Sequence, residues 1–159
     1  MTVQGVTCAK KEAILPATVI VVPIRAEDVD AVWLEAAPFI RLAQRRIERN
    51  VGMSNIYEEL VQGQMCLWLV KMQDKLQAVI ITRVVQHPRR RAFRIEYVAG
   101  KSMTEWLDSS MVTMRKAAQL SGCSVIEADG RRGWTKIAQS IGFKEVHRAF
   151  DMEITDAEQ

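Results

Sequence analysis

The stretch Glu96-Tyr-Val-Ala-Gly-Lys-Ser-Met-Thr-Glu-Trp-Leu107 decides the fold, because a strand ends in it and a long helix begins. A single glycine, Gly100, separates the two. Ser102 and Glu105 have the spacing of a helix capping box, in which each side chain accepts the other residue's amide. A helix start directly after a strand can also bind an anion through its free amides. The stretch therefore predicts a strand, a turn and a helix, and the turn is a candidate phosphate site.

Before this unit, the pattern predicts one strand and three short helices. Residues 18–24 are β-branched and apolar, which is typical of a buried strand. Residues 25–37 have helical spacing and should end near Pro38, since proline disrupts a helix interior. A second amphipathic helix is expected over 39–50, and a capped helix over 54–63.

Three strands should then form a meander. Residues 64–71 and 76–85 flank a Gln-Asp-Lys turn and predict an antiparallel hairpin. Residues 93–98 alternate between apolar and polar and predict the next strand, which enters the opening stretch.

The remaining segments predict a helix, a strand and a closing unit. The long helix is expected over 102–120, with Gly122 as its left-handed cap. A short strand should follow over 125–128, and a short helix over 133–142. Residues 144–154 alternate enough to predict a closing strand or hairpin.

The composition indicates one globular domain. The chain has 159 residues, of which 48% are hydrophobic and 26% charged, enough for one core. We divide it into an extension (1–17), a domain (18–154) and a tail (155–159). No apolar run reaches the roughly 18 residues of a membrane helix, and no signal region precedes the domain, so we expect a cytoplasmic protein with no membrane partner. Three cysteines without C-x-x-C spacing indicate reduced thiols rather than a zinc site.

Arginines gather in two places. A net charge of +3 does not by itself indicate nucleic-acid binding. Residues 89–91 are all arginine, and Arg41, Arg45 and Arg49 share one helix face. They form either a basic surface for an acidic partner or solvated side chains. No aromatic residues interleave them, which argues against a single-stranded nucleic-acid platform.

Five segments carry a resemblance to a known family. They are residues 22–33, 67–70, 78–82, 130–134 and 141–143. In order and spacing they resemble the GCN5-related N-acetyltransferase (GNAT) fold over nearly the whole chain, and they are most similar to small phage-encoded GNAT-like proteins. The resemblance implies an α/β (α+β) fold, with a central mixed, mostly antiparallel sheet of about six to seven strands and about four to five flanking helices.

The resemblance also implies a cofactor and its site. In that family the fourth and fifth strands diverge, the pantetheine arm of acetyl-CoA pairs with strand four, and the pyrophosphate binds the amides that open the next helix. An asparagine near Gly130 often contacts the cofactor, and Asp129 or Arg131 would take its place here. Acetyl-CoA is thus the implied cofactor, with no metal. The implied cofactor-binding residues are Ile95, Tyr97, Val98, Gly100, Lys101, Ser102, Met103, Thr104 and Arg131.

Two positions depart from the family's pattern. The family's phosphate turn contains glycine twice, or glycine and then alanine, whereas residues 100–105 contain one glycine. The family's general acid is a tyrosine four residues before the glycine of the terminal Gly-Phe pair, and Ala138 occupies that position here. The cofactor motif is therefore weakened.

Glu96 is the candidate catalytic residue. Its carboxylate could accept a proton from an amine through water. The other interpretation is a strand residue paired with Arg94 or a neighbouring arginine. His87 and His147 are expected to be surface residues, because neither has further ligands at metal-binding spacing.

Two functional hypotheses follow. The first is a divergent acyl-CoA-dependent N-acetyltransferase whose acceptor is a small-molecule or protein amine. The alternative is a catalytically inactive GNAT-fold phage virion or assembly protein that binds other phage chains or itself. The protein would then lie in the host cytoplasm or the virion.

Overall fold

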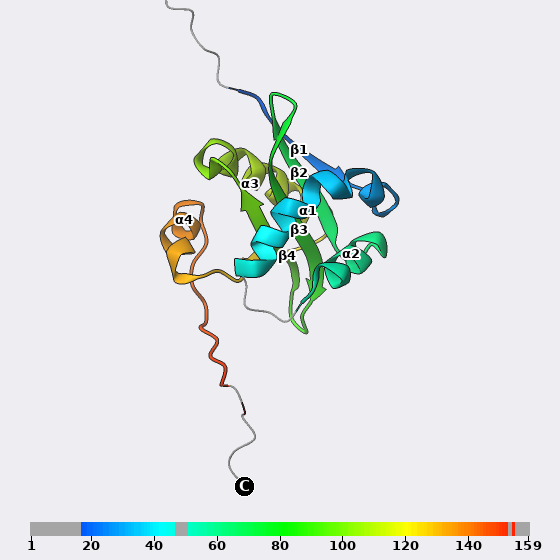
Figure 1. Ribbon diagram of the computed structural model, residues 1–159. Helices are drawn as coiled ribbons and strands as arrows, with labels where there is room; N and C mark the ends of the chain where they lie inside the picture. The colour runs from blue at the N-terminus through cyan, green and yellow to red at the C-terminus, as the bar shows by residue number, and fades with distance from the viewer. Residues whose placement is uncertain (1–16, 47–50, 153, 155–159) are drawn as a thin grey trace, which may run out of the picture.

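A single five-stranded sheet forms the centre of the molecule (Figure 1). The computed structural model describes residues 17–46, 51–152 and 154. The strand order is β1-β2-β3-β4-β5; neighbours are antiparallel except β4 and β5, which are parallel. The mixed, mostly antiparallel sheet is confirmed. The strands are β1 (Val19–Ile24), β2 (Cys66–Met72), β3 (Lys75–Gln86), β4 (Arg91–Gly100) and β5 (Val125–Ala128).

Helices cover both faces of the sheet. Figure 1 shows α1 and α2 in front of the strands and α3 behind them. The α-helices are α1 (Val29–Arg46), α2 (Met53–Val61), α3 (Met103–Leu120) and α4 (Thr135–Ser140), and two 3-10 turns, η1 (Ala26–Asp28) and η2 (Arg132–Trp134), precede α1 and α4. None of the helices among the described residues combines the length and the apolarity that crossing a bilayer requires.

Each face of the sheet has its own core, because strand side chains alternate between faces. Leu67 and Leu69 of β2 pack with α1 and α2, whereas Trp68 and Val70 pack with α3. The α3 core is centred on Trp106, whose side chain is fully buried. Burial of one such large apolar side chain contributes roughly 1.5–3 kcal/mol.

One continuous helix, α1, replaces the two helices predicted around Pro38, so the predicted break is wrong. Proline in a helix interior costs about 3 kcal/mol. Ala36 and Ile40, on either side of it, are both fully buried in the same core, while Pro38 itself is exposed. Packing of this continuous face offsets the lost hydrogen bond. Residues 47–50 of the predicted second helix lie outside the described residues.

The sheet has fewer strands than the six to seven predicted. Residues 144–152 form no strand, although the sequence predicted a closing strand over 144–154. Their large apolar side chains are exposed, so no packed face holds them in register. Residues 1–16 of the predicted extension over 1–17 and the predicted tail over 155–159 lie outside the part of the chain that the structure describes.

Candidate functional site

β4 is longer than its neighbour β5 and extends beyond it. Four residue pairs join them, from Ala92 with Val125 to Ile95 with Ala128. β4 then continues to Gly100 and stays paired with β3. Over residues 96–100, the side of β4 that faces away from β3 therefore has no strand beside it within the described residues. This open edge leads directly to the start of α3.

A β-bulge lies on β4 just beyond its last residue paired with β5. Ile81 pairs with Tyr97 and Thr82 pairs with Ile95, so Glu96 is the extra residue of the bulge. A bulge bends the strand and redirects its side chains, and bulges are frequent beside active sites. The bulge thus places the predicted catalytic residue at the beginning of the open edge.

The Glu96 carboxylate is bound by two arginines. Its Oε1 lies 3.1 Å from Arg83 Nε and 3.2 Å from Arg94 Nε, and its side chain is 9% exposed. The structure therefore contains the pairing with Arg94 that the second interpretation of the sequence expected. The role of Glu96 as a base remains a prediction.

Arg94 joins β4 to β5 at the last paired residues. Besides Glu96, it contacts Glu127 of β5 (Nη1 to Oε1, 3.3 Å) and Asp129 just beyond it. Burial alone would lower the pKa of Arg94, but the nearby carboxylates of Asp129, Glu96 and Glu127 outweigh it and raise the pKa above its ordinary value. Arg94 is thus a charged clamp between β4 and β5 near the end of their pairing.

Glu127 also receives contacts from the β3–β4 loop. His87 Nε2 lies 3.0 Å from its Oε1, and Arg90 Nη2 lies 3.6 Å from its Oε2. Burial raises the pKa of Glu127, but the hydrogen bonds from His87 and Arg94 outweigh burial and hold the pKa below its ordinary value. His87, predicted as a surface residue, is half-buried and belongs to this cluster.

The cluster predicts an acid-dependent loss of stability. Because the folded-state pKa of Glu127 is lowered, its stabilising contribution is complete above its ordinary value of 4.5 and is lost as the pH falls through the folded pKa. We expect the free energy of unfolding of the wild type to exceed that of Glu127→Gln by about 1 kcal/mol above pH ~5.5. This difference should shrink below pH ~4.5. Urea denaturation of both proteins over this pH range measures the difference. Glu35→Gln, at an exposed position of α1, is the control; a difference that stays constant into acid would contradict the prediction.

The predicted capping box at the start of α3 is wrong. Ser102 has a left-handed backbone (φ 52°, ψ 49°), and its side chain makes no capping hydrogen bond. Capping by a serine side chain requires extended backbone at that residue, which explains the difference. The amide of Glu105 donates instead to the carbonyl oxygen of Ser102 (2.9 Å).

Two amides at this helix start are left for an external acceptor. Met103 and Thr104 are the first two residues of α3, so their amides have no intrahelical acceptor. The preceding amide, of Lys101, donates to the Gln77 carbonyl (2.9 Å). Trp106 Nε1 donates to the Lys101 carbonyl (2.7 Å) and anchors the turn. These two hydrogen bonds fix the turn in place. The amides of Met103 and Thr104 are of the kind that binds an anion at a helix start.

The close approach of β3 leaves no room for a side chain at Gly100. A Cβ at this position would lie 2.3 Å from the Cβ of Ala78 and 2.7 Å from the carbonyl oxygen of Gln77. Both distances are far below van der Waals contact. The glycine is therefore explained by close strand packing and is not by itself a sign of a phosphate cradle.

The structure brings most predicted cofactor residues into one run along the open edge. Tyr97 faces the core beneath α1 and α2, and Val98 packs toward the α3 core. Ile95 marks the end of the ladder, and Lys101 is exposed at the turn. Arg131, also exposed, follows β5 and does not belong to this run. The role of each residue remains a prediction.

Sequence reasoning considered the pair of Glu96 with Arg94 but missed the rest of the ion-pair cluster. Glu59 of α2 pairs with Arg83 of β3, which extends the cluster to the helices. The Glu59–Arg83 contact joins residues 24 positions apart and the His87–Glu127 contact joins residues 40 positions apart, so no local pattern shows them. The available signal was the charge on strand residues such as Arg83 and Glu127, because a half-buried charge is costly without a partner.

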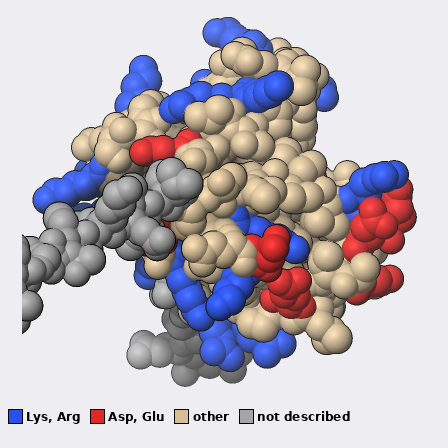
Figure 2. Space-filling model, turned by 90° about the horizontal axis from the view of Figure 1, so that it is seen from above, with Lys and Arg blue, Asp and Glu red and all other residues tan. Residues whose placement is uncertain are grey.

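The wider surface carries both signs of charge. In Figure 2 acidic side chains lie directly beside basic ones, and basic side chains gather at several edges of the view. The face shown has no continuous basic stripe of the kind that follows a nucleic-acid backbone.

Solved structures share this fold. No protein-family model and no curated protein matches the sequence. An N-acetyltransferase of ribosomal-protein alanine from Brucella melitensis biovar Abortus 2308 superposes with a TM-score of 0.66 at 10% identity, covering 87% of this chain and 100% of the other. A predicted acetyltransferase from Clostridium acetobutylicum, solved with acetyl-CoA, gives 0.62 at 11% identity, covering 86% and 96%.

A third similar structure is an aminoglycoside acetyltransferase from an uncultured soil metagenomic sample, in complex with sisomicin. It gives a TM-score of 0.63 at 8% identity, covering 86% of this chain and 95% of the other. At these identities the likeness establishes the fold, and the expected GNAT fold is confirmed.

Proposed function

We propose that the chain is a divergent acetyl-CoA-dependent N-acetyltransferase with a weakened cofactor motif. The observation that carries the proposal is the open edge of β4 over residues 96–100, which starts at a β-bulge and ends at the first turn of α3. The similar acetyltransferases support it, one of them solved with acetyl-CoA and one with an aminoglycoside. The acceptor in this proposal is a small-molecule or protein amine.

The residues present fit such a cofactor. Strand edges bind extended ligands through backbone hydrogen bonds, and the β4 edge offers these to the amide groups of a pantetheine arm. The amides of Met103 and Thr104, with the exposed ammonium of Lys101, fit a pyrophosphate. Glu105, exposed in the same first turn, works against that anion. When bound, acetyl-CoA supplies the activated acetyl group.

The chain's own chemistry at the site is limited to proton transfer. In the proposed role, Glu96 accepts a proton from the amine through water. Two guanidinium groups already contact its Oε1, so the water would approach the carboxylate beside these ion pairs. Ala138 has no proton to donate, so solvent would protonate the departing thiolate. We therefore expect a slow enzyme.

The same features favour a second candidate function. A catalytically inactive GNAT-fold phage virion or assembly protein would keep the fold while losing the proton donor at position 138. The arginine-bound state of Glu96 and the exposed apolar side chains of α1 favour it as well. In this case the protein binds other chains or itself.

Acetyl-CoA binding separates the two candidates. With a Kd near 100 µM, about 1 mM acetyl-CoA stabilises the fold by about 1.4 kcal/mol and raises Tm by roughly 3–5 °C. Lys101→Glu should weaken binding about tenfold, because it reverses the charge beside the pyrophosphate amides. Lys116→Glu, exposed on α3, is the matched control and should bind as wild type. Absence of any shift in wild type would contradict the enzyme and favour the inactive protein.

A further inference from the structure

Arg83 of β3 lies between two carboxylates, Glu59 of α2 and Glu96 of β4. Its Nη2 donates a hydrogen bond to Glu59 Oε2, and its Nε lies 3.1 Å from Glu96 Oε1. The Nε–H is buried, yet it makes no hydrogen bond within the described residues. A buried donor without an acceptor costs free energy, and native structures contain few of them. The direction of the Arg83 guanidinium is therefore set by Glu59 and not by Glu96.

Arg94 of β4 shows the same division of its contacts. Its Nε lies 3.2 Å from the same Oε1 of Glu96, while its Nη2 donates to Asp129. Nε and Nη2 form one edge of the planar guanidinium, and the strongest arginine–carboxylate pairs place two such nitrogens on one carboxylate. In both arginines this edge is instead divided between Glu96 and an outer carboxylate, which is Glu59 for Arg83 and Asp129 for Arg94.

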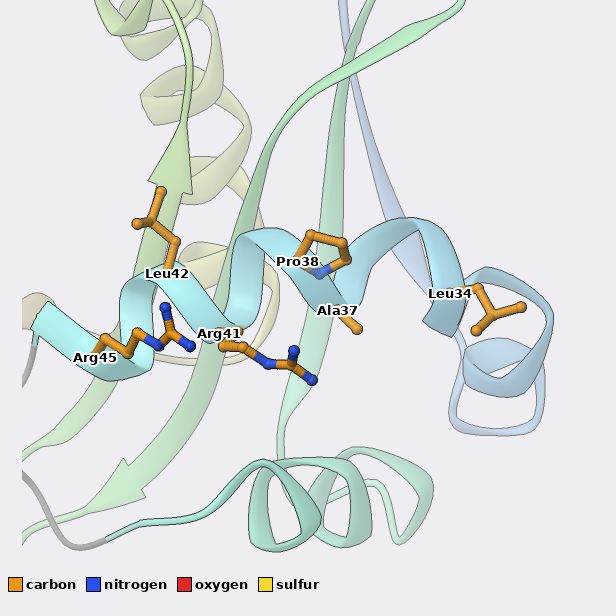
Figure 3. A pocket seen from close by; sticks show the side chains of 6 residues that line it. All are labelled: Leu34, Ala37, Pro38, Arg41, Leu42 and Arg45. Carbon is orange, nitrogen blue, oxygen red and sulfur yellow. The ribbon is translucent and has the colours of Figure 1, made fainter.

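The arginines on the outer side of α1 provide a contrast. Arg41 and Arg45 are exposed, and they line a shallow depression of about 440 Å³ (Figure 3). Water solvates a charge at such a position, so a carboxylate partner adds little there. The side chains of Arg83 and Arg94 are only 31% and 22% exposed. A charge withdrawn from water needs partners, so carboxylates determine where these two guanidinium groups point.

The divided edge limits how firmly Arg83 holds Glu96. Without Glu59, Nη2 could turn with Nε toward Glu96, and two parallel hydrogen bonds would then bind that carboxylate. A carboxylate bound in this way accepts a proton less readily, because the hydrogen bonds stabilise its charged form. A single contact through Nε keeps Glu96 in place without this penalty.

We propose that Glu59 is a positioning residue for Glu96, because it binds Nη2 of Arg83 and so keeps that arginine from forming a two-bond pair with Glu96. The backbone fixes Glu59 itself, since its carbonyl accepts the amides of Gln64 (2.9 Å) and Met65 (3.2 Å) after the end of α2. The inference rests on the proposed function, in which Glu96 accepts the proton of the amine.

Heteronuclear NMR of the arginine Nε–H groups tests the position of Arg83 without any need for activity. The Arg83 signal is assigned by its loss in Arg83→Lys. Glu59→Ala should move it downfield and slow its hydrogen exchange by roughly tenfold, because Nε–H then donates to Glu96. Glu59→Gln keeps an amide oxygen for Nη2, so its effect should be smaller. Glu58→Ala, at the exposed neighbouring position of α2, is the matched control and should leave the signal unchanged.

Acetyl transfer to poly-lysine and to butylamine measures the consequence for catalysis. Glu59→Ala should lower kcat by roughly tenfold while KM for acetyl-CoA stays unchanged. Adding Arg83→Gln to this variant should restore kcat to within about threefold of wild type, because the arginine that would bind Glu96 is then absent. A merely structural role of Glu59 would give no such recovery.

Two results would overturn the proposal. One is an Arg83 signal that does not respond to Glu59→Ala, and the other is a loss of kcat that Arg83→Gln does not restore. A wild type that acetylates neither amine would contradict the proposed function instead, and the NMR result would still decide whether Glu59 positions Arg83. Far-UV circular dichroism confirms that each variant is folded.

Discussion

Replacing Gly100 by alanine is expected to lower the free energy of unfolding by about 3 kcal/mol, near the upper end for overpacking in a well-packed interior. The added Cβ would meet the backbone and Cβ of β3 at Gln77 and Ala78, at 2.3 to 2.8 Å. Backbone cannot rotate away as a flexible side chain can. Since the open edge of β4 depends on its pairing with β3, acetyl-CoA binding should fall as well. Thermal and urea unfolding measure the loss, which corresponds to roughly 6–12 °C in Tm.

Gly133→Ala is the matched control. A Cβ at Gly133 would have no atom within 4 Å, so we expect a change of at most about 0.5 kcal/mol. If Gly100→Ala were as stable as Gly133→Ala, strand packing would not explain the glycine. Its role would then have to be sought in a ligand.

Replacing Arg94 by glutamine should lower the free energy of unfolding by about 2 kcal/mol. The substitution leaves the carboxylates of Glu96, Glu127 and Asp129 without the positive charge that joins them across β4 and β5. Removing one partner of a fully buried pair costs 3–5 kcal/mol, and partial exposure of this site lowers the figure. Urea unfolding at pH 7 measures it.

Arg148→Gln provides the comparison for Arg94. Arg148 pairs with Glu145 at an exposed position, and its loss should leave stability unchanged. Equal stability of the two variants would show that the Arg94 clamp does not hold the strands together. The association of β4 with β5 would then depend on backbone pairing alone.

The elements governed by local patterns could be predicted from the sequence. The alternation in residues 93–98 and the helical spacing from Ser102 to Leu120 correspond to β4 and α3. These signals are strong because each extends over several periods. The order of these elements also identified the GNAT fold, which the similar acetyltransferases confirm.

The errors arose where tertiary contacts override local preference. Pro38 lies inside α1 because the buried residues beside it hold the helix together. Ser102 adopts a left-handed conformation that no spacing rule indicates, and the capping box is lost with it. Residues 144–152 alternate like a strand but form none, and their large apolar side chains are exposed. The cluster around Arg94 depends on contacts that the fold alone brings together.

Amide hydrogen exchange of the full chain, with and without acetyl-CoA, tests the central claim most directly. The claim is that the β4 edge beyond Ile95 and the start of α3 form one cofactor site. Peptides covering residues 96–104 should exchange more slowly with about 1 mM acetyl-CoA, while those covering Met53–Val61 of α2 should not change. Unchanged exchange over 96–104, or protection confined to another part of the chain, would contradict the account.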